Sequence, residues 1–222
     1  MNSSYKTSTN ARALAKEFLE IKSIVFNVEN PFTWVSGIKS PVYCDNRRIN
    51  SFVAVRNMVV DAFVDLIKAE FNQVEMIGGV ATGGIPMGIL VADRMNLPFI
   101  YVRQEPKKHG MMRQVEGHFI PKSRVVLIED HISTGGSSLK AVEGLRQAEL
   151  ELLGLISIMT YGFDKASDRF NKANVNYLSL SDLATALEVA NEQRVIADVD
   201  LESISTFIKN PESWFTNSGS AQ

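Results

Sequence analysis

The sequence has little cysteine, little histidine and no long apolar run. Its 222 residues include one cysteine, Cys44, and three histidines, which rules out an intrachain disulfide and is too few for a Cys/His zinc cage. No apolar run approaches the roughly 20 residues that a helix needs to cross a bilayer. The polar start, residues 1–5, lacks the charge and apolar core of a signal peptide. We therefore expect a cytoplasmic protein in a reducing compartment, with no membrane partner.

Neither sign of charge dominates the sequence. There are 23 Lys and Arg against 25 Asp and Glu, which gives a net charge of -2. The chain thus lacks the basic excess that would hold nucleic acid over a broad surface, and it lacks the acidic excess that is typical of disorder. No nucleic-acid partner is expected, and ligands have to be inferred from local groups of residues.

Apolar residues make up 45% of the sequence, and from residue 51 onward their spacing alternates between extended and helical. Ser51 is a candidate N-cap for a helix whose apolar face starts at Phe52. Later strands are expected at 75–79, 98–102, 125–129 and 153–161, with helices at 85–94 and 137–149. This alternation predicts an α/β fold with a central, mostly parallel sheet flanked by helices, and with ligands at the carboxyl ends of the strands.

The first 50 residues follow a different pattern. A helix is expected over 11–21 behind Asn10, a candidate N-cap, and short extended pieces follow at 31–37 and 41–44. The extended pieces predict a small antiparallel appendage, like a hood. We expect a single domain of 1–222. It would consist of an appendage over about 1–50, an α/β core over about 51–180, and a C-terminal helical segment and tail over 181–222.

Residues 125–138 carry the strongest chemical signal. They comprise a buried strand, two acids, a loop of small residues and the start of a helix. Main-chain N–H groups in such a loop can surround an anion, because glycines allow a close approach and a helix N-terminus favours negative charge. Hydroxyls of Ser133, Thr134 and Ser137 add donors. The loop lacks the lysine of a nucleotide P-loop, so the sequence predicts a phosphate site of another kind.

Two adjacent acids, Glu129 and Asp130, follow the strand directly. Carboxylates at a strand end can accept hydrogen bonds from a ribose diol, so a phosphorylated sugar fits better than a bare nucleotide tail. An ordinary strand-turn-helix with a solvated acidic pair is the alternative interpretation.

This pattern resembles the motif with which type I phosphoribosyltransferases bind PRPP (5-phosphoribosyl 1-pyrophosphate). The resemblance implies the type I phosphoribosyltransferase fold, a loop that holds the 5-phosphate, and acids that hold the ribose 2- and 3-hydroxyls. For His131 a spacer or packing role is favoured over catalysis. The PRPP-binding residues that the resemblance implies are Glu129, Asp130, His131, Ile132, Ser133, Thr134, Gly135, Gly136 and Ser137.

A polar segment over 103–123 is too long for an ordinary connection, and it begins with four cations and a histidine within 103–113. Such a segment can close over a polyanion and stabilise a departing pyrophosphate, although a solvated basic loop is the alternative. It resembles the catalytic loop of orotate phosphoribosyltransferases. By that likeness Arg103, Lys107 and His109 are catalytic and bind PRPP, while Gln104 replaces a second lysine of many relatives.

Residues 32–47 also resemble orotate phosphoribosyltransferases, especially a bacterial branch that carries Tyr-Cys-Asp-Asn-Arg. A structural hairpin pinned by an Asp/Arg pair is the alternative. Val35 stands where some members have a base-contacting lysine. We therefore expect Arg47 to bind the orotate carboxylate, because a guanidinium suits it bidentately. Ser133 matches a family hydroxyl that touches orotate.

The fourth motif is Ala81, Thr82 and Gly83, which follow a predicted strand and resemble the pyrophosphate loop of the family. A tight strand-to-helix turn would explain the glycines nearly as well. All four motifs occur in family order. The resemblance implies transfer of the 5-phosphoribosyl group from PRPP to orotate, which gives orotidine 5-monophosphate and pyrophosphate in pyrimidine (UMP) biosynthesis. It also implies Mg2+ held mainly through PRPP, and a homodimer with shared active sites.

Two other functions would share some of these motifs. A type I phosphoribosyltransferase for a purine base would keep the 129–137 motif, but it need not keep the 32–47 segment or the loop with Lys107 and His109. A noncatalytic PRPP-sensing regulator should add a basic DNA-binding module. The region before Phe32 is too short and too mixed in charge for such a module.

Overall fold

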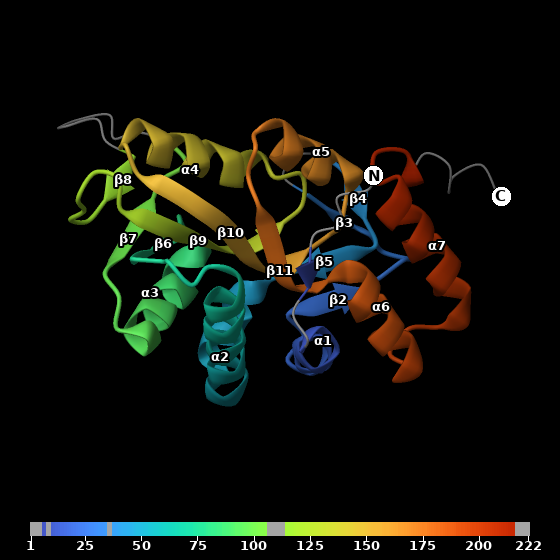
Figure 1. Cartoon of the computed structure of the whole chain (residues 1–222). Helices are drawn as coiled ribbons and strands as arrows, with labels where there is room; N and C mark the ends of the chain where they lie inside the picture. The colour runs from blue at the N-terminus through green and yellow to red at the C-terminus, as the bar shows by residue number, and fades with distance from the viewer. Residues whose placement is uncertain (1–5, 8–9, 35–36, 106–113, 216–222) are drawn as a thin grey trace.

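A mostly parallel seven-stranded sheet forms the centre of the fold (Figure 1). The computed structural model describes residues 6–7, 10–34, 37–105 and 114–215. Neighbouring strands are parallel except β7 and β8, which pair antiparallel. In sheet order the strands are β1 (Lys6–Thr7), β11 (Tyr177–Asp182), β10 (Glu151–Thr160), β9 (Arg124–Ile132), β6 (Met76–Val80), β7 (Phe99–Val102) and β8 (Val115–Glu116). The predicted α/β sheet is thereby confirmed.

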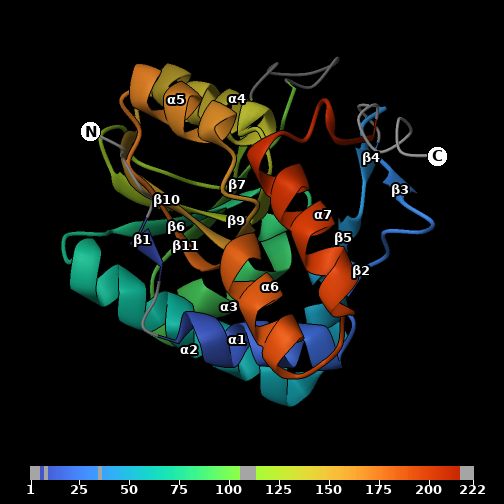
Figure 2. The same cartoon turned by 90° about the vertical axis from the view of Figure 1, so that its right-hand side faces the viewer.

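Helices cover both faces of this sheet, as Figures 1 and 2 show. One face carries α4 (Gly136–Gln147) and α5 (Asp164–Lys172). The other face carries α1 (Ala11–Glu20), α2 (Val53–Glu70), α3 (Gly84–Met95) and α6 (Leu183–Glu192), and α7 (Asp198–Lys209) packs against α6. With both faces covered, every central strand is buried on two sides.

Strand β9 shows how the two halves of the core are divided. Val125 and Leu127 belong to the apolar cluster under α4 and α5, whereas Val126 and Ile128 belong to the cluster under α1, α2 and α3. Successive side chains of a strand point to opposite faces, so a strand covered on both faces needs apolar residues at every position. This requirement explains the unbroken apolar run that the sequence shows before its two acids.

Strand β9 also runs three residues beyond its predicted end at Glu129 and so takes in the second acid, Asp130. The extension is paired with β10, where His131 is aligned with Met159 and Ile132 with Thr160. The pairing makes the strand longer than its apolar run, because main-chain hydrogen bonds do not depend on side-chain polarity. The two acids are consequently held on a strand and are not part of the loop that follows it.

The start of α2 differs from the prediction. Ser51 is the last residue of a 3-10 helix, η1 (Asn46–Ser51), and the N-cap of α2 is Phe52, which has no side-chain capping bond. The predicted Ser51 cap is therefore wrong, because the preceding 3-10 turn delays the start of the α-helix. Asn10 stands at the N-cap of α1 as predicted, yet its side chain makes no capping hydrogen bond.

The N-terminal appendage consists of two antiparallel ribbons. One pairs β2 (Ile24–Phe26) with β5 (Val42–Cys44), and the other pairs β3 (Phe32–Thr33) with β4 (Lys39–Ser40). The antiparallel appendage was predicted, but the two extended pieces do not pair with each other. The second piece pairs with β2, which was not among the predicted strands.

An aromatic cluster joins the appendage to the core. The Trp34 ring meets Tyr161, which follows β10, edge to face at 5.0 Å, and it meets Phe207 of α7 at 5.8 Å. Phe163 packs on Phe207 at 5.9 Å. Buried aromatic pairs of this geometry each contribute roughly 0.5–1.5 kcal/mol beyond their area. The cluster holds the appendage next to the carboxyl end of β10.

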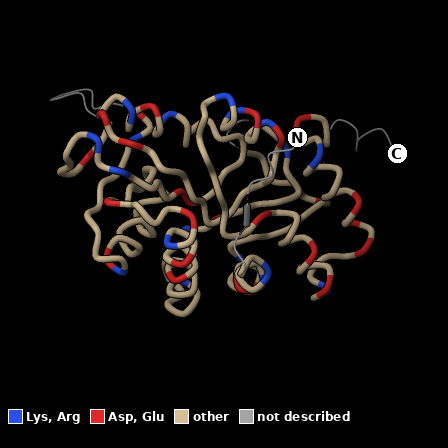
Figure 3. The backbone as a smooth tube through the Cα atoms, in the orientation of Figure 1, with Lys and Arg blue, Asp and Glu red and all other residues tan. Residues whose placement is uncertain are grey.

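The charged residues of both signs are interspersed along the chain in the view of Figure 3. This distribution agrees with the net charge of -2. Among the helices of the described residues, none combines the length and the apolarity that a membrane span requires.

Candidate active site

A cavity of about 630 Å³ lies where the appendage meets the carboxyl ends of β6, β9 and β10. In open α/β sheets this end of the strands is where ligands bind. The appendage contributes Thr33, Trp34, Tyr43, Cys44, Asp45 and Arg47, and the core contributes Thr82, Gly83, Asp130, His131, Ser133 and Tyr161. Members of three of the sequence motifs, which are far apart in the chain, thus line one cavity.

Asp130 has its carboxylate at the centre of this arrangement. The carboxylate accepts a 2.8 Å hydrogen bond from the main-chain N–H of His131, and its Oδ1 lies 3.3 Å from His131 Nδ1. A Cβ at position 83 would overlap the carboxylate, so only glycine leaves room for it. Burial would raise the pKa of Asp130, but the hydrogen bonds and charge of His131 outweigh burial and lower the pKa to about 2. Asp130 is therefore ionised at neutral pH.

Glu129 has a different environment from its neighbour. Its side chain is buried, with the residue only 4% exposed, and it accepts hydrogen bonds from Ser138 Oγ at 2.9 Å and from the Asp130 N–H at 3.1 Å. Burial, and next the charge of Asp130, raise the pKa of Glu129 well above its ordinary value. Of the two predicted ribose acids, Asp130 lines the cavity and Glu129 lies under the start of α4.

The loop from Ser133 to Gly135 connects β9 to α4. Gly135 has a left-handed conformation with φ of 74°, and a Cβ there would come within 2.7 Å of the Phe170 ring. Both observations require glycine. The first N–H groups of an α-helix have no acceptor within the helix, and the helix dipole places positive charge beside them. The turn and the start of α4 therefore form a suitable site for an anion.

A second turn connects β6 to α3 beside Asp130. The peptide bond between Ala81 and Thr82 is cis. The turn packs tightly on β9, since a Cβ at position 84 would overlap the carbonyl oxygen of Ile128. This packing holds Thr82 and Gly83 in the wall of the cavity.

The appendage side of the cavity is aromatic and basic. Arg47 Nε donates a 2.6 Å hydrogen bond to Asp45 Oδ1, while 65% of the Arg47 side chain is exposed. The Asp/Arg pair of the structural alternative therefore exists, and the same arginine lines the cavity. Its other nitrogens still carry N–H donors. The half-exposed Tyr43 ring packs on Phe32 at 5.3 Å.

Of the three predicted catalytic residues, Arg103 is the one within the described part of the chain, and it lies away from the cavity. Arg103 Nη1 lies 3.8 Å from Glu116 Oε1, at the pair of β7 and β8, and Arg103 is not among the lining residues of the cavity. Lys107 and His109 lie outside the described residues, as does Val35.

The structure places two further residues at the site that were not among the predicted site residues. Buried Asn46 donates from Nδ2 to the carbonyl oxygen of Asp130 at 2.8 Å, although it belongs to the Tyr-Cys-Asp-Asn-Arg stretch that was singled out. Tyr161 lines the cavity. Only a contact between distant segments reveals either role, and no local signal points to it.

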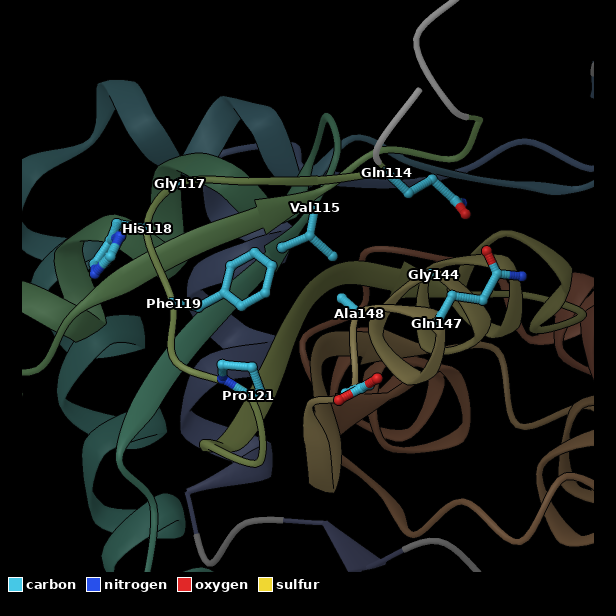
Figure 4. A pocket seen from close by; sticks show the side chains of 10 residues that line it. Gln114, Val115, Gly117, His118, Phe119, Pro121, Gly144, Gln147 and Ala148 are labelled. Atoms are coloured by element: carbon cyan, nitrogen blue, oxygen red, sulfur yellow. The ribbon is translucent and has the colours of Figure 1, made fainter. Parts of the chain in front are cut away.

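Another cavity, of about 530 Å³, lies apart from this site (Figure 4). It is formed between the segment that follows β8 and the C-terminal part of α4. Figure 4 shows Val115, Phe119 and Gln147 among its lining residues. None of the residues that line the first cavity lines this one.

Comparisons with known proteins agree with the fold and the site. The phosphoribosyl transferase domain model matches residues 52–190, which defines the class of the chain. The chain shares 48% identity with the orotate phosphoribosyltransferase of Bacillus subtilis, over 91% of this chain and 94% of that protein. The chain belongs to the orotate phosphoribosyltransferase family. The predicted family is thereby confirmed, and the chain is a pentosyltransferase enzyme.

Solved structures show the same fold. The crystal structure of orotate phosphoribosyltransferase from Aeropyrum pernix matches with a TM-score of 0.71 and 29% identity, over 83% of this chain and 99% of that chain. Adenine phosphoribosyltransferase from Leishmania donovani matches with a TM-score of 0.62 and 20% identity, over 83% of this chain and 87% of that chain. The fold is therefore shared between enzymes named for different bases. The fold therefore does not identify the base, which has to be inferred from the residues of the site.

Proposed function

We propose that the cavity of about 630 Å³ binds PRPP and orotate side by side and joins them to give orotidine 5-monophosphate and pyrophosphate. The observation that carries the proposal is the convergence of Asp130, Arg47 and Ser133, the first residue of the turn before α4, on one cavity. An ionised acid, an anion-binding turn and a cation are what a phosphorylated sugar and a carboxylate-bearing base require.

In the PRPP half of the site, the turn and the start of α4 hold the 5-phosphate. Asp130 accepts hydrogen bonds from the ribose hydroxyls, and Glu129 supports it from below by accepting the Asp130 N–H. The turn at Thr82 and Gly83 receives the pyrophosphate. Arg103, Lys107 and His109 are proposed to add positive charge to the pyrophosphate, as the family resemblance implies.

In the base half, Arg47 donates to the orotate carboxylate and Ser133 donates to the ring. Arg47 is anchored by Asp45 through Nε, which leaves its terminal N–H groups for a carboxylate. The partly exposed ring of Tyr43 offers an apolar face to a planar base. Wall residues of this kind favour an anionic, flat base over a neutral one.

The reaction breaks the bond between ribose C1 and the pyrophosphate oxygen, and it forms a bond between C1 and a ring nitrogen of orotate, whose N–H proton is released to pyrophosphate or solvent. Positive charge develops on the ribose and negative charge on the leaving group. The fixed charge of Asp130 stabilises the ribose cation, and donors at Thr82 and Gly83 stabilise the leaving group. No side chain acts as a nucleophile in this scheme.

Mg2+ would be held at the proposed site mainly by the phosphates of PRPP. The described residues contain no group of three or more His, Cys, Asp or Glu side chains that could hold a metal. Mg2+ commonly binds through one or two carboxylates together with substrate phosphates, and Asp130 supplies such a carboxylate. When bound, the ion would neutralise charge on the pyrophosphate.

We also propose a cytoplasmic homodimer in which Lys107 and His109 of one chain complete the site of the other. The basic segment that carries them and the family resemblance support this arrangement. An interface of this kind obeys a twofold axis, so both sites of the dimer would be completed equally.

The proposed function is tested with a panel of bases incubated with the enzyme, PRPP and Mg2+, followed by identification of the products. Orotate should be consumed, while uracil, adenine and hypoxanthine should react poorly because they lack the carboxylate that Arg47 binds. A uracil or purine nucleotide that forms faster than orotidine 5-monophosphate would refute the assignment of the base.

A further inference from the structure

Helix α5 lies beside α4 on the same face of the sheet (Figures 1 and 2) and touches the outer side of the Ser133 to Gly135 turn. Arg169 Nη1 donates a 3.0 Å hydrogen bond to the carbonyl oxygen of Thr134. Phe170, fully buried and stacked on Tyr177 at 4.3 Å, packs on Gly135. Two consecutive residues of α5 therefore hold two consecutive residues of the turn.

The bond to Thr134 determines the direction of a peptide group. A trans peptide unit is planar, so its N–H points opposite to its C=O. With the Thr134 carbonyl drawn toward α5, the N–H of Gly135 is directed to the other side of the turn. Glycine at a positive φ has access to several backbone conformations, so without a restraint this peptide could rotate and turn its N–H away from an anion.

The charge of Arg169 is also available to the turn. Within the described part of the chain, no carboxylate lies at ion-pair distance from Arg169, in contrast to Arg12 and Arg124, which pair with Glu192 and Glu75. A Cβ at position 136, the first residue of α4, would lie 3.5 Å from Arg169 Nη1. The guanidinium thus adds a positive charge at the start of α4, where the helix dipole already favours an anion.

We propose that Arg169 is a positioning residue for binding the 5-phosphate: it fixes the Thr134–Gly135 peptide so that the turn presents its donor, and it adds charge from behind the turn. The inference rests on the proposed function, in which this turn holds the 5-phosphate. Arg169 acts through the turn and does not touch the reacting atoms. Arg169 should therefore stabilise bound PRPP equally in the ground state and in the transition state. Its loss should then raise the KM for PRPP and leave kcat unchanged.

Arg146 provides a matched control. It is another exposed arginine, and its Nη2 donates a 2.8 Å hydrogen bond to the carbonyl oxygen of Ala173, the C-cap of α5, one turn after Arg169. Replacing it removes one positive charge and one carbonyl bond from α5 without touching the turn. An effect that comes merely from loosening α5 should therefore appear equally in Arg146→Gln and Arg169→Gln.

The experiment compares the wild-type enzyme with Arg169→Gln, Arg169→Lys and Arg146→Gln. The measured quantities are the KM for PRPP, the KM for orotate, kcat, and the inhibition constants of ribose 5-phosphate and pyrophosphate. Arg169→Gln should raise the KM for PRPP and the ribose 5-phosphate constant roughly tenfold, which corresponds to about 1.4 kcal/mol. The KM for orotate, kcat and the pyrophosphate constant should not change. Arg169→Lys should be intermediate, since it keeps the charge and loses the fork geometry.

A variant of the turn separates failure of this inference from failure of the proposed function. Ser137→Asp places a negative charge in the first turn of α4, where it favours the helix and repels a phosphate. If ribose 5-phosphate inhibits wild type and Ser137→Asp equally, the turn is not the phosphate site and the proposed function fails. If Ser137→Asp loses inhibition while Arg169→Gln behaves like wild type or like Arg146→Gln, the role of Arg169 is refuted.

Discussion

The side-chain amide of Asn46 donates a 2.8 Å hydrogen bond to the main-chain carbonyl oxygen of Asp130, which follows it by 84 residues in the chain. Asn46 is only 2% exposed, and its own oxygen accepts a 3.3 Å hydrogen bond from the buried Cys44 thiol. This chain of contacts runs from the appendage to the acid that is proposed to bind ribose. It couples the two halves of the cavity through the main chain.

Replacing Asn46 with alanine should therefore affect both halves of the site. The carbonyl of Asp130 would lose its buried donor, and an unsatisfied buried group costs about 1–3 kcal/mol. We expect the free energy of unfolding in urea to fall by that amount, and the KM values for PRPP and orotate to rise together. Cys44→Ala, which keeps the bond between Asn46 and Asp130, should have a smaller effect. Unchanged KM values in Asn46→Ala would show that the coupling has no part in substrate binding.

The two acids of the motif should respond differently to neutralisation. Asp130→Asn removes an ionised carboxylate from the cavity wall, so productive PRPP binding should weaken while the fold remains. Glu129→Gln replaces a buried acid whose pKa lies well above its ordinary value, and it keeps an acceptor for Ser138. Glu129→Gln should therefore weaken PRPP binding less than Asp130→Asn does. Titration calorimetry with PRPP measures the affinities, and thermal unfolding checks the fold. Equal losses of affinity in both variants would contradict the different roles.

Arg47→Ala should raise the KM for orotate more than the KM for PRPP. The loss of a charged hydrogen bond costs on the order of 2 kcal/mol, and the bond lost here is the one to the orotate carboxylate. Arg47→Lys should recover part of the affinity, since it restores the charge without the bidentate geometry. Steady-state kinetics with each substrate varied in turn provides the measurement. An equal rise of both KM values would remove Arg47 from the base site.

The pair of Asp130 and His131 predicts a pH dependence of stability. Burial alone would lower the pKa of His131, but the hydrogen bond and charge of Asp130 raise it above its ordinary value. A raised histidine pKa contributes stability that is complete below the unfolded pKa and is lost as the pH rises through the folded pKa. The contribution of Asp130, with a pKa of about 2, is lost instead as the pH falls through the range below about 3.9, its unfolded value.

The stabilising effect of the pair should consequently be largest between about pH 4 and pH 6.5. The measurement is urea unfolding of wild type and His131→Gln from about pH 4.5 to about pH 9. This range begins above the ordinary pKa of Asp, about 3.9, and extends well beyond that of His, about 6.5. The difference between the two proteins should shrink as the pH rises above the folded pKa of His131. A difference that is constant over this range would mean that the pair is not charged in the folded protein.

The shared-site dimer predicts complementation between two inactive variants. Lys107→Ala and Asp130→Asn are mixed after reversible dissociation, so that about half of the dimers are mixed, and each mixed dimer has one intact site of two. Activity should recover to roughly a quarter of the wild-type value. If each segment serves its own chain, every site carries a lesion. No recovery, despite demonstrated subunit exchange, would then exclude the shared site.

The sequence alone determined those features that neighbouring residues specify. The apolar run of β9 and the small-residue turn after it are local patterns, because burial on both faces and the approach of an anion each constrain consecutive positions. The family followed from four such patterns in order. Strand β11 was not among the predicted strands. Both of its serines are buried: Ser179 forms a 3.0 Å hydrogen bond with Ser157 Oγ, and Ser181 donates one of 3.0 Å to the Ala11 carbonyl oxygen.

Only the tertiary structure decided which residues meet at the cavity. The sequence treats Glu129 and Asp130 as a pair, but the packing of α4 on β9 buries the first and leaves the second at the cavity. In the same way, the bonds from Asn46 to Asp130 and from Arg169 to Thr134 join segments 84 and 35 residues apart. The physical reason is that such contacts depend on how whole helices and ribbons pack against the sheet, and no pattern of adjacent residues encodes that packing.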